Sequence, residues 1–147
     1  MSVNMYSEIR AALDAHLEAW GDVPKVGGHL MVNWEGTQFD KPPPKSSAWL
    51  KTQLLHADAD GRTLGGTPTT RLNGVYHLNV FAPSGTGPGA ADQLSDSLMR
   101  RFKSGVRLTS GTTTVTLRTP FRAPGRSETD WYQVPVMVRW YSHTEEL

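Results

Sequence analysis

The sequence contains no cysteine among its 147 residues. This absence excludes disulfide bonds, thiol catalysis and every zinc site that needs cysteine ligands, and it agrees with synthesis in a reducing cytoplasm. No apolar run approaches the roughly 18 residues of a membrane-spanning helix. Polar residues (Asn4, Glu8 and Asp14) stand where a secretory signal needs an apolar core. We therefore expect a soluble protein made in the cytoplasm.

The sequence also has little net charge, because 15 basic residues nearly balance 14 acidic ones and leave +1. A field this small does not favour nucleic acid or an anionic membrane as a tight-binding partner. Glycine, proline and threonine are abundant, which predicts long loops. The length predicts one domain over residues 1–147 with a core of its own.

Residues 74–103 are predicted to form a strand, a tight loop and an amphipathic helix. Tyr76, Leu78 and Val80 alternate with residues of the opposite face, which is the period of a strand. Turn-forming residues fill positions 83–89, and a helix follows from about residue 89 to 103. Its apolar stripe consists of Ala91, Leu94, Ser95, Leu98 and Phe102. We expect Leu94, Leu98 and Phe102 to be buried against the sheet.

The remaining segments predict an α+β fold, with a mostly antiparallel sheet, two amphipathic helices packed on one face, and long loops. The first helix is expected to begin at a Ser2 or Asn4 cap and to end near Trp20. Further strands are predicted at 30–34, 48–56 and 131–141, the last one interrupted at Pro135, and a hairpin at 106–108 and 112–119. Loops are predicted at 35–47, 57–73 and 120–130.

Three patterns suggest a ligand site, and each lacks a necessary part. Gly85 to Gly89 precedes a helix, but the spacing is wrong for a dinucleotide fingerprint and no Lys-Ser or Lys-Thr follows, so a structural turn is predicted. Asp58-Ala59-Asp60-Gly61 lacks the later acidic ligands of a calcium loop. The histidines do not stand at metal-ligand spacing; they are His16, His29, His56, His77 and His143. We predict no catalytic residue, no cofactor and no metal.

A set of segments in order along nearly the whole chain resembles one known family. The segments are Tyr6 to Leu13, Val32 to Glu35 before the proline-rich loop, Trp49-Leu50, Leu64-Gly65-Gly66, and Gly74 to Pro83 followed by Gly85-Thr86-Gly87. The chain resembles the tail-terminator (tail-completion) proteins of long-tailed bacteriophages and prophages. None of these segments is a catalytic motif, so the resemblance concerns fold and loops.

The resemblance implies a structural virion protein that assembles as a homo-oligomeric ring, with a hexamer expected. The ring would cap the head-proximal end of the tail tube, stop its polymerisation and help to join head and tail. The implied partners are other copies of the chain, the tail tube protein, head–tail connector proteins and DNA passing through the lumen, without a membrane. The protein would be made in the host bacterial cytoplasm and reside in the virion tail.

Two alternatives remain open from the sequence. One is another structural role in the same assembly, as a head–tail connector or a minor tail subunit. The other is a small enzyme with an unrecognised site. A mass measurement separates them, because a ring favours a tail role and a monomer with a deep polar pocket favours an enzyme.

Residues 57–73 are predicted to be an assembly loop that becomes ordered on the tail tube, because the segment is long, polar and aperiodic. Arg62 and Arg71 could bind carboxylates there, and Leu64 could supply an apolar anchor. Arg122 and Arg126, in the predicted loop 120–130, are the other expected contact residues.

Overall fold

The computed structural model describes residues 5–39, 41–57, 59–64, 67–85 and 87–144, and for residues 60–64 and 67–68 it describes the backbone alone. The two helices are α1 (Met5–Glu18) and α2 (Gly89–Arg101). The strands are β1 (Lys25–Val26), β2 (His29–Leu30), β3 (Val32–Asn33), β4 (Trp49–His56), β5 (Asp60–Leu64), β6 (Thr67–Pro83), β7 (Arg107–Ser110), β8 (Thr113–Leu117), β9 (Phe121–Arg122), β10 (Arg126–Ser127) and β11 (Trp131–Thr144).

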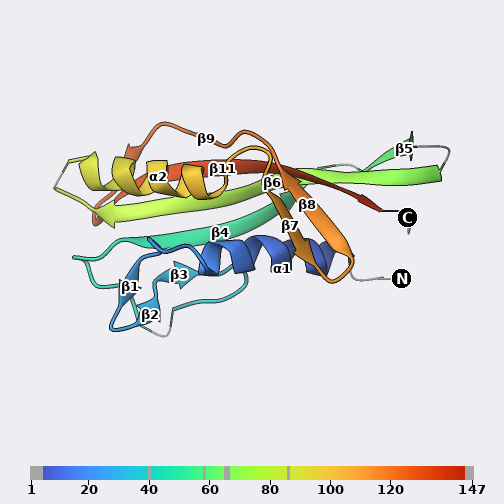
Figure 1. Ribbon diagram of the computed structural model, residues 1–147. Helices are drawn as coiled ribbons and strands as arrows, with labels where there is room; N and C mark the ends of the chain where they lie inside the picture. The colour runs from blue at the N-terminus through green and yellow to red at the C-terminus, as the bar shows by residue number, and fades with distance from the viewer. Residues whose placement is uncertain (1–4, 40, 58, 65–66, 86, 145–147) are drawn as a thin grey trace.

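One nine-stranded sheet dominates the molecule, in the order β3-β4-β6-β11-β8-β7, with β5 beside β6 and with β9 and β10 beside β11. β1 and β2 form a separate two-stranded sheet. Within the described residues, β3 pairs with β4 in parallel, and the other strand pairs run antiparallel. The long strands β6 and β11 run side by side through the whole molecule (Figure 1). This combination of two helices with a curled, mixed sheet agrees with the predicted α+β class.

The core lies on one face of β4, β6 and β11, which we call the inner sheet face. Tyr76, Leu78 and Val80 of β6 are fully buried, as the alternation predicted. The register sets Val80 opposite both Leu50 and Val134, so the inner positions of the three strands form continuous apolar rows. The inner sheet face consists of Leu50, Leu54, Tyr76, Leu78, Val80, Val134, Val136, Val138 and Trp140.

Both helices bury side chains in the same core. Leu98 and Phe102 of the second helical segment are fully buried, which confirms that part of the prediction. Leu94 is only partly buried, so its prediction was wrong. At about 100° per residue, Leu94 lies about 60° from Ala91 on the helical wheel, at the edge of the buried stripe. A residue at that edge contacts the core with one side only.

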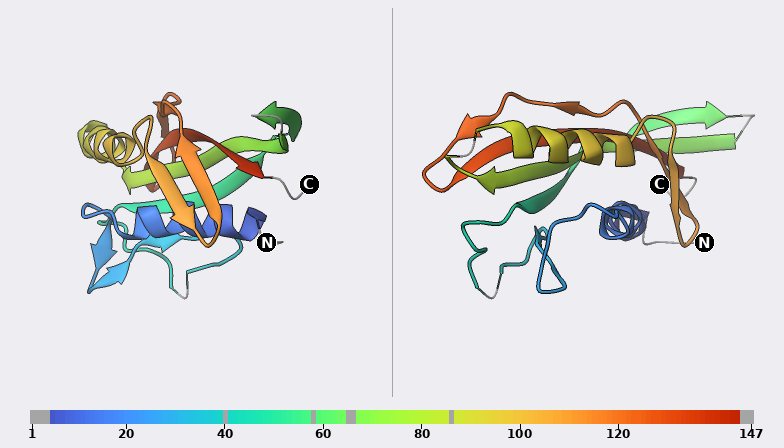
Figure 2. Two further views of the ribbon diagram at one scale, coloured as in Figure 1. Left: turned by 45° about the vertical axis from the view of Figure 1, so that its right-hand side comes forward. Right: turned by 60° about the vertical axis from the view of Figure 1, so that its left-hand side comes forward.

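The two helices also bond to each other near their ends. His16 Nε2 lies 2.8 Å from the carbonyl oxygen of Arg101, and Arg101 Nε donates to the carbonyl oxygen of His16 at 3.1 Å. Their axes cross steeply, since α1 is seen nearly end-on in the right-hand view of Figure 2 while α2 lies across it. α1 ends at Glu18, two residues earlier than predicted, although Trp20 is still buried. The predicted caps Ser2 and Asn4 lie outside the described residues.

The segment 57–73 is not the irregular loop that the sequence analysis predicted. β5 pairs with the first part of β6 from Asp60 opposite Arg71 to Leu64 opposite Thr67. The resulting hairpin projects from the body of the molecule (Figure 1). The segment lacks the period-2 alternation of apolar and polar residues that indicates a strand, so the sequence did not reveal this hairpin. The β-branched threonines of this segment nevertheless favour extended backbone.

Pro135 does not interrupt the last strand, which runs continuously from Trp131 to Thr144. In an antiparallel strand, the nitrogen and oxygen of one residue face the same neighbour. The Pro135 oxygen accepts from the Ala123 N–H at 2.9 Å, so its nitrogen faces that side too. β10 pairs with residues 132–133 and β9 with residues 136–137, so no ladder bond is required of the proline between them.

Three smaller differences concern short strands. The predicted strand 30–34 divides into β2 and β3, and the predicted loop 120–130 contains β9 and β10. Each of these strands is two residues long, too short to produce a periodic pattern. The hairpin of β7 and β8 was predicted correctly.

Candidate assembly surface

The opposite side of the same strands forms a second surface, which we call the outer sheet face. Its positions alternate with those of the core and are aligned by the strand register, which sets Gln53 opposite His77 and His77 opposite Met137. The short strands add Phe121, opposite Met137, and Arg126, opposite Gln133. The face comprises Trp49, Lys51, Gln53, Leu55, Arg71, Asn73, Val75, His77, Asn79, Phe81, Phe121, Arg126, Trp131, Gln133, Pro135, Met137, Arg139, Tyr141 and His143.

An aromatic cluster closes one end of the outer sheet face. The rings of Trp49 and Phe81 stack with centroids 3.9 Å apart and an interplanar angle of 4°. Phe39 and Trp131 meet Trp49 edge-on at 5.6 and 5.8 Å. Phe81 is only 6% exposed although no core lies on this side of the sheet. The aromatic side chains therefore cover one another and make this end of the face rigid.

Two arginine side chains lie over aromatic rings farther along the outer sheet face. The guanidinium carbon of Arg139 is 4.5 Å from the Phe121 ring centroid, and that of Arg71 is 4.5 Å from the Tyr141 centroid. Such stacking holds a guanidinium in one orientation and leaves its N–H edge available to an acidic group. On the same face, His77 lies opposite Met137 and has a pKa lowered by burial, which favours its neutral form at neutral pH.

The structure separates the five predicted contact residues. Arg71 and Arg126 lie on the outer sheet face, and Arg126 is exposed. Arg62 and Leu64 lie on β5, opposite Thr69 and Thr67, and their side chains are outside the description. Arg122 points to the opposite side, where its Nη1 donates to Asp92 Oδ1 of α2 at 2.8 Å. Their contacts with a partner stay a prediction.

The sequence analysis did not single out Lys51, Leu55, Phe121 or Arg139 as contact residues. In the strand predicted at 48–56, Lys51 and Leu55 alternate with the apolar Leu50 and Leu54, and this alternation could have drawn attention to a cation on the face opposite the core. Phe121 and Arg139 come together only through the register of β9 with β11, which the sequence does not reveal.

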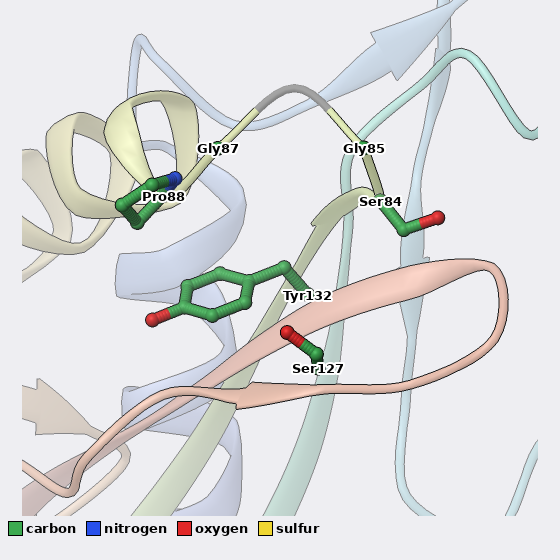
Figure 3. Close-up of a pocket in the computed structure, with 6 residues that line it drawn as sticks. All are labelled: Ser84, Gly85, Gly87, Pro88, Ser127 and Tyr132. Carbon is green, nitrogen blue, oxygen red and sulfur yellow. The ribbon is translucent and has the colours of Figure 1, made fainter.

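The glycine-rich loop before α2 lines a small pocket of about 160 Å³. Gly85 and Gly87 have φ angles of 85° and 80°, in the left-handed region that favours glycine, which makes the loop a tight turn. Figure 3 shows the Tyr132 ring lying between Pro88 and Ser127. The described lining contributes hydroxyl groups and no cationic side chain. A structural turn therefore accounts for this loop, and nothing in the lining favours a phosphate.

A polar network connects α1 to the sheet. The Tyr76 hydroxyl donates to Asp14, whose pKa is raised by burial although this hydrogen bond opposes the shift. Glu35 accepts from Arg10 Nη1 at 2.7 Å and from the Leu54 N–H at 2.8 Å, and the latter bond is the main cause of its lowered pKa. These groups satisfy one another's hydrogen-bonding requirements. They therefore hold α1 in its position against the sheet.

The described residues contain neither a metal-binding cluster nor a membrane-spanning helix. Across residues 5–144, with the gaps stated above, no cluster of three or more His, Asp or Glu side chains could hold a metal ion. Nor does a helix of this part have the length and apolar character required to cross a membrane. The absence of a metal, a cofactor and an active site stays a prediction.

Comparison with known proteins identifies the family to which this chain belongs. The sequence model of a family described as phage tail terminator protein matches residues 8–140. The chain belongs to the phage tail terminator family. Its members are proteins of the virion tail, so the protein is a tail component and a structural rather than enzymatic role is indicated. No curated protein sequence is significantly similar to the chain.

Two solved structures share the fold of this tail terminator. One, which carries no functional description, has 26% sequence identity and a TM-score of 0.71, with 98% of this chain and 96% of the other covered. The second belongs to the virion of a native gene transfer agent particle, with 15% identity, a TM-score of 0.54, and coverage of 97% and 100%. At that identity, the second comparison shows the fold alone.

Proposed function

We propose that this tail terminator caps the head-proximal end of the tail tube as a homo-oligomeric ring, most simply a hexamer. The ring stops polymerisation of the tube and provides the surface on which head–tail connector proteins assemble. Its lumen lets DNA pass. The observation that carries the proposal is the family match, which spans residues 8–140 and therefore includes almost every described element.

The geometry supports a role in assembly because the described residues form extended surfaces suited to binding other proteins. The outer sheet face exposes aromatic, apolar and arginine side chains, the composition typical of protein interfaces. The hairpin of β5 and β6 projects from the body, where it can reach a neighbouring subunit or the tube (Figure 1). We propose that partners contact Arg62 and Leu64 on the hairpin, and Arg71 and Arg126 on the outer sheet face. Arg122 has a function within the subunit instead, because it forms an ion pair with Asp92.

Genetic complementation tests the proposal. A phage that lacks the gene is expected to make tails of irregular, excessive length without heads, and the restored gene is expected to give tails of uniform length joined to heads. Tail length and head attachment are measured by negative-stain electron microscopy. Tails of uniform length in the absence of the gene would contradict the capping role, and uniform but headless tails would contradict only the role in joining.

A further inference from the structure

Among the described side chains, the outer sheet face carries charge of one sign. Lys51, Arg71, Arg126 and Arg139 lie on it, and no carboxylate occupies an outer position of β4, β9, β10, β11 or the described side chains of β6. The backbone register of β5 adds Asp60 and Arg62 at neighbouring positions. The net charge of the whole chain is only +1, so this segregation is a property of the fold and not of the composition.

The geometry fixes two of these cations in place. Arg139 lies over Phe121 and Arg71 over Tyr141, each at 4.5 Å. Arg139 is four positions along β11 from His143, the residue opposite Arg71, so the backbone positions of the two arginines lie roughly 13 Å apart along the sheet. Because each guanidinium already rests over an aromatic ring, both can donate hydrogen bonds to a carboxylate at little further cost in side-chain entropy.

Apolar side chains occupy the area among the cations. Leu55 is 45% exposed and Phe121 is 36% exposed, and they are two of the three exposed large hydrophobic residues among the described side chains. The register sets Val75 between Leu55 and Arg139, and Met137 beside Phe121. A phosphate backbone makes no use of exposed Leu, Met and Phe, whereas a protein interface is enriched in aromatic residues, Met and Arg. The composition therefore favours a protein as the ligand of this face.

We infer that the outer sheet face docks another protein of the tail, whose surface presents carboxylates around an apolar centre. The inference rests on the proposed function, in which the terminator binds the end of the tail tube. The partner's carboxylates would meet Lys51, Arg71, Arg126 and Arg139, and its apolar centre would cover Leu55 and Phe121.

A second copy of this chain fits the outer sheet face less well than a different protein does. Among the described carboxylate side chains, most already accept a hydrogen bond or form an ion pair within the subunit. Only Glu18, Asp96 and Glu128 do not, and they lie on α1, on α2 and after β10. These three carboxylates, scattered over the described part of the chain, do not complement four cations that share one face.

Charge reversal with a matched control tests the inference. Lys51→Glu/Arg139→Glu reverses two exposed cations of the outer sheet face, and Arg100→Glu/Lys103→Glu reverses two exposed cations at the end of α2. Each purified protein is sedimented with tail tubes assembled from the tube protein of the same phage, at low and at physiological salt. We expect the outer-face variant to lose affinity about tenfold or more, and the α2 variant to bind as the wild type does.

A neutral variant separates lost charge from lost folding. Lys51→Gln/Arg139→Gln keeps side chains of similar length, so its melting temperature is expected to stay at the wild-type value, with binding intermediate between wild type and the Glu variant. Binding that remains unchanged in both outer-face variants would overturn the inference while leaving the capping role intact. Failure of the wild type itself to bind tubes would contradict the proposed function, and the inference with it.

Two further measurements on the same variants examine other ligands. Light scattering reports oligomeric state, and a shift in mass for the outer-face variant with unchanged tube affinity would make a second copy the occupant and overturn the inference. Titration with short duplex DNA reports nucleic-acid binding. Tight DNA binding that the outer-face variant loses, again with unchanged tube affinity, would assign the face to the transiting DNA instead. We expect neither change.

Discussion

The inner and outer sheet faces are built by the same strands and have different physical roles. Along β6, Tyr76, Leu78 and Val80 are fully buried, whereas the intervening His77 and Asn79 remain partly exposed. The inner face binds the two helices through a continuous apolar core, and the outer face carries cations, aromatic rings and exposed apolar groups. Because side chains alternate along a strand, one segment can stabilise the subunit and recognise a partner without conflict.

The largest expected difference in stability is between removing an apolar side chain that packs on the inner sheet face and removing one from the outer sheet face. Leu98→Ala leaves a cavity between α2 and the inner sheet face, and it should lower the free energy of unfolding by roughly 2–5 kcal/mol. Leu55→Ala, on the outer face, should lower it by less than about 1 kcal/mol, because that side chain is already 45% exposed. Urea denaturation measures both. Equal losses would contradict the division of roles.

A smaller loss of stability is expected for a substitution at Gly74, where the neighbouring strands leave no room for a side chain. A Cβ atom on Gly74 would lie 2.0 Å from the Leu55 carbonyl oxygen and 2.9 Å from Cζ2 of Trp140. Gly74→Ala should therefore destabilise the protein by about 1–3 kcal/mol, since backbone atoms must move.

Gly89→Ala is the matched control for Gly74→Ala. Gly89 begins α2 and has open space around its Cβ position, so its change should be neutral or slightly stabilising. Thermal unfolding compares the two variants. A neutral Gly74→Ala would show that the strands can separate at this point.

These features differ in how well the sequence reveals them. The alternation of residues 74–82 was readable because one side is buried, and the α2 stripe was readable for the same reason, apart from Leu94 at its edge. The hairpin of β5 and β6 escaped prediction because its sequence does not alternate between apolar and polar residues. The predicted interruption of the last strand at Pro135 was wrong, because the side to which the proline nitrogen points depends on the pairing with the neighbouring strands. The outer sheet face requires the register of five strands, which local patterns do not contain.

A still smaller effect on stability concerns Asp14, a partly buried carboxyl group that accepts a hydrogen bond from the Tyr76 hydroxyl. Burial raises the pKa of Asp14, so ionisation opposes folding: its stabilising contribution is complete below the unfolded-state pKa and is lost as pH rises through the folded-state value. Asp14→Asn removes this titration and keeps an acceptor for the Tyr76 hydroxyl.

The Asp14→Asn variant should melt above the wild type at about pH 7, and the difference should shrink towards about pH 4. Thermal unfolding at both values measures it. Glu35→Gln is the contrasting control, because the lowered pKa of Glu35 means that the ionised form stabilises the fold above its unfolded-state pKa. A pH-independent difference for Asp14→Asn would contradict the role of burial.

The smallest expected effect on stability, combined with a large one on assembly, concerns the projecting hairpin. Replacing residues 61–69 by a short Gly-Ser turn should change the free energy of unfolding by less than about 1 kcal/mol, since loop closure depends weakly on length. The shortened protein should fail to cap tubes if the hairpin contacts a partner. Normal tails joined to heads would show that the hairpin serves only as a connection.

The length of tail tubes grown in the presence of the protein tests the central claim most directly. Purified tube protein is allowed to polymerise with and without the wild-type terminator, and tube lengths are measured by electron microscopy. The account predicts that added terminator stops elongation and is found at one end of each tube. Tubes that continue to lengthen at the same rate, with the protein absent from their ends, would contradict it.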